Sequence, residues 1–258
     1  MKVKFAHENF DMFVYKTNDS VSDSIIKKGS WEDQETKSIL EALSFYSKKL
    51  NITKNDITII DIGANIGWFS LILGKKGYKI ISFEASNFNY YILLKNFCVN
   101  EEINMTIINE GLYNINKNWT LYHPISNIGN AYIMNNISNL KGFIKENIKL
   151  TKLESYIPFL KSKNIALIKL DIEGSEGKAL EGGIYLITKY HIPFIFLEFS
   201  PSALRLKGSN PKLVLKMFIN NRYSISTKNF LLKDNISLKK LLKVKQINIY
   251  LTYNIFLK

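Results

Sequence analysis

From residue 57 onward, two kinds of hydrophobic pattern alternate along the chain, and this alternation predicts the fold. Short apolar runs rich in Ile, Leu and Phe predict strands at 57–61, 79–83, 104–108, 165–170 and 193–198. Apolar residues at helical spacing predict helices at 66–76, 87–99, 175–190 and 210–220. Strands that alternate with helices favour an α/β fold, with a mostly parallel, doubly wound sheet covered on both faces.

Three regions depart from this alternation. Residues 1–30 hold short strand-like pieces, including 12–15, and residues 32–50 read as an amphipathic helix. Residues 112–150 mix aromatic and polar positions with turn residues, as in 126–130, and predict hairpins or loops inserted between the third and fourth strands. The strand-like runs 223–227 and 244–256 fit a closing antiparallel pair at the sheet edge. We expect one domain over 1–258, with 1–50 capping the site and the insertion shaping a substrate pocket.

The bulk composition is that of an ordinary globular domain. The 258 residues are 46% hydrophobic and 22% charged, and no apolar run reaches the roughly 18 residues of a membrane span. The amino terminus lacks a secretory signal. The single cysteine, Cys98, excludes an internal disulfide and suits a reducing compartment, and its neighbours predict the buried face of a helix. These features predict a cytoplasmic protein.

The net charge of +13 raises the question of nucleic-acid binding. The charge comes almost entirely from lysine, since Arg205 and Arg222 are the only arginines, and arginine is the side chain suited to bidentate contacts with phosphate and guanine. The lysines are scattered among Asn and Ile. A compositional bias therefore accounts for the charge more simply, although nucleic-acid binding stays open.

The first candidate ligand site is the sequence Asp61-Ile-Gly63-Ala64-Asn65-Ile-Gly67, at the end of a predicted strand. Glycines allow a tight turn and a close approach of backbone to a small ligand, while Asp61 could meet an ammonium group. A dinucleotide fingerprint would need further glycines at 65 and 68, where this chain has Asn and Trp. The pattern therefore favours S-adenosylmethionine as the ligand.

Acids also follow the next two strands. Glu84, followed by Ala85, ends the strand 79–83, where a carboxylate can accept hydrogen bonds from both hydroxyls of a ribose. Glu110 and Gly111 follow the strand 104–108, in a loop that would lie beside an adenine. Together with the first turn, these residues predict a site for an adenosine-containing cofactor.

A second group of candidates suggests the chemistry. The strand 165–170 ends in Asp171, Glu173 and Glu176, and carboxylates there could orient a hydroxyl, accept its proton or bind a divalent metal. Glu176 could equally serve the amino end of the following helix. His123, in the insertion, is a further candidate base, and Glu198, at the end of 193–198, could contact the acceptor.

The chain resembles the FkbM methyltransferases, a branch of the class I S-adenosylmethionine-dependent enzymes. The matching blocks are Ile60-Asp-Ile-Gly-Ala-Asn-Ile-Gly67, Ser82-Phe-Glu-Ala85, Ile168-Lys-Leu-Asp-Ile-Glu-Gly-Ser-Glu176 and Phe194-Ile-Phe-Leu-Glu198. The resemblance covers about residues 30 to 200. One departure is that the family commonly has Glu-Pro where this chain has Glu84-Ala85. The resemblance implies a seven-stranded sheet with a reversed final hairpin, and methyl transfer to oxygen, often on a sugar or polyketide.

The sequence thus predicts an S-adenosylmethionine-dependent O-methyltransferase acting on a sugar, glycan or related small metabolite. The expected cofactor-binding residues are Asp61, Gly63, Ala64, Asn65, Gly67, Glu84, Ala85, Glu110, Gly111 and Asp171. The expected catalytic residues are Asp171, Glu173 and His123. An RNA or other nucleic-acid methyltransferase and a non-catalytic binding protein on the same fold remain alternatives, and the need for a metal and the oligomeric state are left open.

Overall fold

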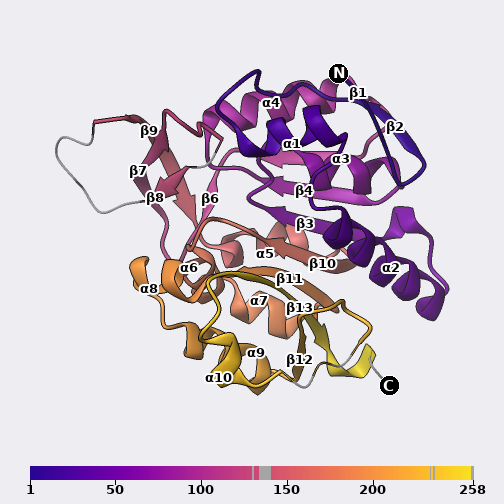
Figure 1. The fold of residues 1–258 in the computed structure, drawn as a ribbon. Helices are drawn as coiled ribbons and strands as arrows, with labels where there is room; N and C mark the ends of the chain where they lie inside the picture. The colour runs from indigo at the N-terminus through magenta and orange to yellow at the C-terminus, as the bar shows by residue number, and fades with distance from the viewer. Residues whose placement is uncertain (130, 134–140, 233, 235, 257–258) are drawn as a thin grey trace.

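A seven-stranded sheet, in the order β12-β13-β11-β10-β3-β4-β5, forms the centre of the computed structural model (Figure 1). The structure describes residues 1–129, 131–133, 141–232, 234 and 236–256. The strands of this sheet are β3 (Thr58–Ile62), β4 (Lys79–Phe83), β5 (Met105–Ile108), β10 (Ile165–Leu170), β11 (Phe194–Phe199), β12 (Tyr223–Ser226) and β13 (Ile247–Tyr253). The five strands from β11 to β5 are parallel, and β13 runs antiparallel to both β11 and β12. The predicted doubly wound sheet with its antiparallel terminal pair is confirmed.

Helices cover both faces of this sheet. One face carries α2 (Asp33–Leu50), α3 (Trp68–Lys75) and α4 (Asn87–Cys98), and the other carries α5 (Ile157–Leu160), α6 (Glu176–Glu181), α7 (Ile184–Lys189) and α9 (Pro211–Asn220). Neighbouring strand residues point to opposite faces, so Ile59 belongs to the first core and Ile60 to the second. Both are fully buried, which explains why the central strands read as continuous apolar runs.

The prediction of a single helix over 175–190 is wrong, because two helices, α6 and α7, occupy this stretch. The break lies at Gly182 and Gly183, where the backbone is crowded by its neighbours: a Cβ on Gly182 would lie 2.1 Å from the carbonyl oxygen of Tyr113. Two further short helices, α8 (Pro201–Leu206) and α10 (Leu238–Leu241), were not predicted. Serine side chains cap both at the amino end, Ser200 for α8 and Ser237 for α10.

The amino-terminal region differs most from expectation. Strands β1 (Lys2–Phe5) and β2 (Glu8–Asp11) form a separate antiparallel pair, and α1 (Ser20–Lys28) was not predicted. The strand predicted at 12–15 is absent from this described stretch, because side chains replace a strand partner there. Asn96 accepts from the amide of Phe13, and Ser22 accepts from the amide of Tyr15.

The predicted burial of Cys98 is also wrong. Cys98 is exposed at the last residue of α4, whose buried face consists of Asn89, Leu93 and Asn96. Two of these three are polar, and both asparagines hydrogen-bond to other segments of the chain, so apolar residues alone did not mark the buried side.

The insertion forms a small second sheet in the order β6-β9-β7-β8, which stands at the left of Figure 1. Its strands are β6 (Gly111–Leu112), β7 (Lys117–Pro124), β8 (Tyr132–Ile133) and β9 (Phe143–Thr151). The predicted hairpins are confirmed in 112–129, 131–133 and 141–150, and the rest of that expectation, including Asn130, lies outside the described residues. No helix among the described residues is long and apolar enough to cross a membrane.

Candidate active site

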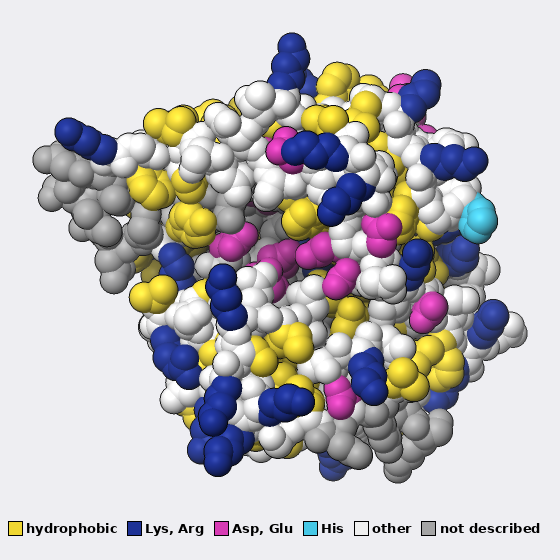
Figure 2. All heavy atoms as spheres, viewed as in Figure 1, with side chains coloured by type: hydrophobic (Ala, Val, Ile, Leu, Met, Phe, Trp, Pro, Cys, Tyr) yellow, Lys and Arg dark blue, Asp and Glu magenta, His cyan; other side chains and the backbone are white. Residues whose placement is uncertain are grey.

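A cavity of about 370 Å³ lies at the carboxyl ends of the parallel strands, where ligands bind in open α/β sheets. Residues following β3, β4, β10 and β11 line it, together with parts of the amino-terminal region and of the inserted sheet. Its described lining includes seven carboxyl side chains and a single cation, Lys169. Figure 2 shows acidic side chains gathered in this hollow, while the basic side chains are scattered around it. The cavity is therefore acidic on a chain of net charge +13.

The turn after β3 needs its glycines because the protein itself fills the space around them. Gly63 has φ +78°, and a Cβ there would lie 1.9 Å from the backbone oxygen of Asp171. Gly67 has φ +99°, and its Cβ would lie 2.5 Å from Leu93 Cδ1. Gly63, Ala64 and Asn65 line the cavity, whereas Gly67 is not among the described lining residues. Packing therefore sets the glycine requirement here, against the loop after β10 at Gly63 and against α4 at Gly67.

Glu84 holds this turn from the next strand. Its Oε2 accepts from the amide of Asn65 at 2.7 Å, and its Oε1 accepts from the amide of Ser86 at 2.9 Å. Burial raises the pKa of Glu84 to about 7, although both amides favour the charged form. Glu84 and Ala85 both line the cavity, so the carboxyl is fixed where the sequence predicted a ribose-binding acid.

Asp61 does not reach the cavity directly. It is almost fully buried, its Oδ2 accepts from Ser70 Oγ at 2.6 Å, and its Oδ1 lies 3.6 Å from Lys169 Nζ. Lys169 Nζ also lies 3.3 Å from Asp171 Oδ2. Burial opposes the charge of Lys169, but Asp171 and Asp61 outweigh it and hold the pKa of Lys169 above its usual range. Direct contact of Asp61 with a ligand's ammonium group is therefore not supported.

Glu110 and Gly111 both line the cavity, at the start of the inserted sheet. Glu110 Oε2 accepts from the hydroxyl of Tyr156 at 2.7 Å, and its other oxygen pairs with Lys149. Gly111 opens β6, and a Cβ there would lie 2.7 Å from Leu150 Cδ2. The side chain of Glu110 is thus already engaged. A ligand would therefore meet the backbone groups of this loop.

Carboxyl groups crowd the opposite side of the cavity. Asp171 and Glu173 follow β10, Glu198 stands near the end of β11, and Glu32 comes from the segment before α2. Burial raises the pKa of Glu32 and of Glu173 to about 7, and the charge of Asp171 adds to both shifts. Burial also raises the pKa of Glu198 to about 9, reinforced by Asp171, Glu173 and the other nearby acids. We call Glu32, Asp171, Glu173 and Glu198 the acidic cluster.

Sequence reasoning missed two of the residues on this side of the cavity. Lys169 carried a signal, since it is a lone cation inside an apolar strand next to an acid. Glu32 carried none, because it lies just before a helix and only the fold turns it inward, with φ +46° and its Oε2 buried without a partner. Among the described residues, no group of three or more His, Cys, Asp or Glu has the arrangement of a metal site.

Glu176 has a structural position. Its Oε1 accepts from the amides of Ile172 and Gly174, at 2.9 and 3.0 Å, and the side chain is almost fully buried. It therefore fixes the loop that carries Asp171 and Glu173. Burial raises the pKa of Glu176 to about 7 despite these amides.

His123 lies apart from the cavity. It is fully buried in the inserted sheet, with Nδ1 2.9 Å from the carbonyl oxygen of Ile128 and Nε2 2.6 Å from Glu146 Oε2. The edge of its ring meets Phe88. Both nitrogens are engaged and the residue is not among the described lining of the cavity, so the geometry favours a structural role over the predicted catalytic one.

Comparison with known proteins agrees with this geometry. Residues 61–225, well over half of the chain, match the model of the methyltransferase FkbM domain. The chain belongs to the FkbM methyltransferase family. As an FkbM methyltransferase it falls in the EC 2.1.1 class, and the family implies S-adenosylmethionine as the methyl donor. No curated protein sequence matches the chain.

Solved structures share the fold of this FkbM methyltransferase. The crystal structure of WbdD superposes with a TM-score of 0.54 at 12% identity, over 93% of this chain and 45% of WbdD. Monomeric WbdD gives a TM-score of 0.53 at 14% identity, over 93% and 46%. A precorrin-6y C5,15-methyltransferase from Geobacter metallireducens gives a TM-score of 0.46 at 11% identity, over 94% of both chains. The chain spans less than half the length of the WbdD chains that it matches.

Proposed function

We propose that this protein transfers the methyl group of S-adenosylmethionine to a hydroxyl oxygen of a sugar, glycan or related small metabolite. One observation carries the proposal: the described lining of the cavity at the carboxyl ends of the parallel strands has seven carboxyl groups and one lysine, on a chain whose net charge is +13. An acidic cavity favours a cationic ligand over an anionic one. S-adenosylmethionine carries both a sulfonium and an ammonium charge.

The residues of the cavity fit the parts of this cofactor. Glu84 would accept from the ribose hydroxyls, and the backbone of the turn at 61–67 would approach the methionine part. The ammonium group would be met by Asp171 and by Glu32, whose buried Oε2 has no hydrogen-bond partner in the part of the chain that the structure describes. Backbone groups of Glu110 and Gly111 would face the adenine.

The acceptor would enter between the acidic cluster and the inserted sheet. Leu121, Ala131 and Ile133 supply apolar lining there, and the acidic cluster supplies carboxyl groups. Carboxylates accept hydrogen bonds from hydroxyls, so this half suits a neutral polyol better than an anion. The carboxyl groups also disfavour a nucleic acid as the acceptor, because its phosphates would face groups of the same charge.

The chemical demand on the protein is modest. The methyl group on a sulfonium is already activated, so the protein has to hold the acceptor oxygen in line at near-attack distance and remove its proton. Asp171 is fixed by its ion pair with Lys169, and this gives it an orienting role. Glu173 has no hydrogen-bond partner among the described residues and borders the same space, which suits contact with the acceptor hydroxyl.

Cofactor binding tests the proposal first. S-adenosylhomocysteine should raise the melting temperature of the wild-type protein by mass action, and calorimetry should give its affinity. Glu84→Ala should abolish the shift, and Glu84→Gln should weaken binding by about tenfold or more, because one charge-assisted acceptor is lost. Glu41→Ala, at an exposed position of α2, is the matched control and should bind as wild type does.

The acceptor class needs a second experiment. The protein would be incubated with S-adenosylmethionine and a panel of sugars, glycans, lipids and RNA, with a mass gain of one methyl group as the readout. Transfer to polyols supports the proposal, whereas transfer to RNA alone would replace it with the nucleic-acid alternative. Cofactor binding without transfer to any member would favour a binding protein on this fold.

A further inference from the structure

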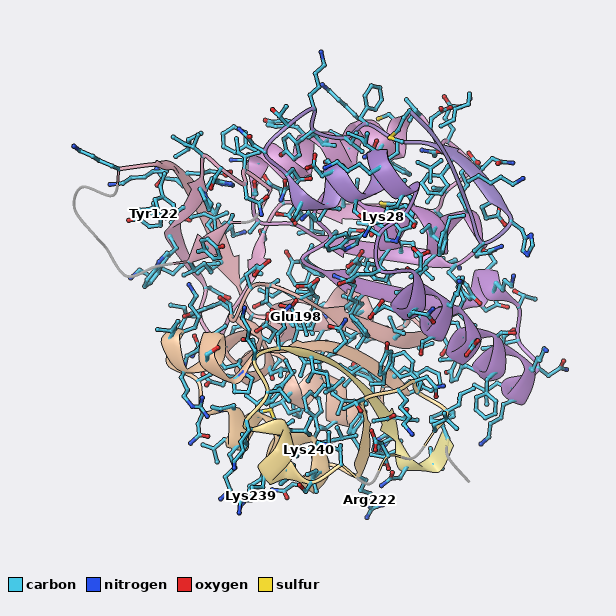
Figure 3. The ribbon with its side chains drawn as sticks, in the orientation of Figure 1. Lys28, Tyr122, Glu198, Arg222, Lys239 and Lys240 are labelled. Atoms are coloured by element: carbon cyan, nitrogen blue, oxygen red, sulfur yellow. The ribbon has the colours of Figure 1, made fainter. Side chains whose placement is uncertain are left out.

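Glu198 occupies a central place in the acidic cluster because of strand register. On the neighbouring parallel strands β10 and β11, Leu170 pairs with Leu197, so the next residues, Asp171 and Glu198, follow side by side at the carboxyl edge. Glu198 lies near the centre of the molecule in Figure 3 and borders the cavity. A strand end in the middle of a sheet is a rigid support, unlike the loop that carries Glu173 at φ +55°.

Glu198 also differs from the other cavity acids in what binds it. Glu84 accepts from two backbone amides, and Asp171 pairs with Lys169. Glu198 has one hydrogen bond among the described residues, donated by Gln246 Nε2 to its Oε1. That contact orients the carboxyl group and leaves Oε2 free to meet a ligand in the cavity.

The charges that face Glu198 are mostly of its own sign. Asp171 and Glu173 come from the loop after β10, Glu176 from α6, and Glu32 from the segment before α2. The nearby cations are Lys169, which is held by Asp61 and Asp171, and Lys207, which is half-buried beside Glu173 and Glu176 and donates to the carbonyl oxygen of Ile133. Burial and this repulsion together raise the pKa of Glu198 to about 9.

We propose that Glu198 is the catalytic residue that accepts the proton of the methylated hydroxyl, and that it becomes charged only when a cationic methyl donor occupies the cavity. This inference rests on the proposed function. A positive charge brought close to the acidic cluster favours the ionised form of its carboxyl groups, so donor binding would release a proton. The acceptor oxygen then forms its bond to the methyl carbon while the carbon–sulfur bond breaks, its electron pair stays on sulfur, and the hydroxyl proton passes to the Glu198 carboxylate.

Proton release on binding tests the charge step without any acceptor. Titration calorimetry with S-adenosylmethionine at pH 8, in two buffers of different ionisation enthalpy, measures the protons released. The wild-type protein should release up to about one proton per site, and fewer with S-adenosylhomocysteine, which lacks the sulfonium charge. Release should decline above pH 9, where Glu198 ionises without the ligand.

Variants assign the proton to its residue. Glu198→Gln should release markedly fewer protons and should bind S-adenosylmethionine about tenfold more weakly than wild type at pH 8, because the proton-linked part of the binding free energy is lost. Glu181→Gln, in α6 and outside the described cavity lining, should behave as wild type. Equal release by wild type and Glu198→Gln, or no release by wild type, overturns the inference. Failure of wild type to bind at all contradicts the proposed function itself, so the two failures are distinct.

Turnover tests the proton transfer. With an acceptor from the panel and saturating cofactor, Glu198→Gln should lower the transfer rate by about 10² to 10⁴-fold, as expected for loss of a general base. Glu173→Gln should have the smaller effect. A wild-type rate in Glu198→Gln would show that another group takes the proton.

Discussion

The two sides of the cavity treat their carboxyl groups in opposite ways. On the side of β3 and β4, Glu84 accepts from two backbone amides, and Asp61 is paired with Ser70 and Lys169. On the side of β10 and β11, Glu173 and Glu198 face other acids and have few donors. The carboxyl groups of the first side have their hydrogen-bond and ion-pair partners before a ligand binds. Those of the second side repel one another until a ligand binds.

This difference suggests a division of labour. Groups that are already satisfied fix the shape of a binding site, because they do not reorganise when the ligand enters. Groups that repel one another take up protons, and they release them when positive charge arrives. Lys169 is the connection between the two sides, since it contacts Asp61 on one and Asp171 on the other.

Removing that connection should have the largest effect. Lys169→Met leaves the buried Asp61 and the partly exposed Asp171 without their cation, and breaking a buried pair costs about 3–5 kcal/mol in free energy of unfolding. Urea unfolding would measure it, with Lys37→Met at an exposed position of α2 as the control. Adding Asp61→Asn to Lys169→Met should restore part of the loss, and a loss below about 1 kcal/mol for Lys169→Met would contradict the buried ion pair.

The next effect concerns the close contact of the two strand ends. Gly63→Ala should cost about 2–4 kcal/mol, because it combines a left-handed backbone with a Cβ forced against the backbone of Asp171. Gly29→Ala is the matched control, since Gly29 has φ +76° and nothing within 4 Å of the added Cβ. It should lose only about 1 kcal/mol, the cost of the conformation alone. Equal losses at the two positions would show that crowding at Gly63 is unimportant.

The last prediction concerns the pH dependence of stability. Glu32, Glu84, Glu173 and Glu176 have pKa values raised to about 7 and Glu198 to about 9, above the value near 4.3 of an unfolded glutamate. The folded protein therefore binds more protons than the unfolded chain between about pH 4.5 and pH 9, so the stabilisation by these protons is lost as pH rises through this window.

Thermal unfolding without ligand would measure that loss. The melting temperature should fall continuously between pH 6 and pH 9.5. Glu198→Gln should remove nearly all of the decline above pH 8, where only Glu198 among these acids still holds a proton, and should lessen the decline below pH 8 by the share of this one group. A melting temperature that rises with pH across this window would mean that the acids ionise normally in the fold.

Local pattern was enough to predict the central sheet. Strands 79–83 and 165–170 were predicted to the residue, because buried parallel strands are continuous apolar runs with clear ends. The predictions of one helix over 175–190 and of a buried Cys98 were wrong. Contact with Tyr113 decides the first, and the hydrogen bonds of asparagines in α4 to distant segments decide the second. These contacts join residues far apart in the sequence, and no local window contains them.

By itself, the sequence determined the family, the positions of the parallel strands along the chain and the acids that follow β4 and β10, because strand ends and glycine turns are local signals. Only the tertiary structure decided what each acid faces. It buried Asp61 against Lys169, enclosed His123 in the inserted sheet, brought Glu32 in from the amino-terminal region and set Glu198 beside Asp171. The reason is physical: the charge state of a carboxyl group depends on burial and on neighbours within a few ångströms, and those neighbours come from distant parts of the chain.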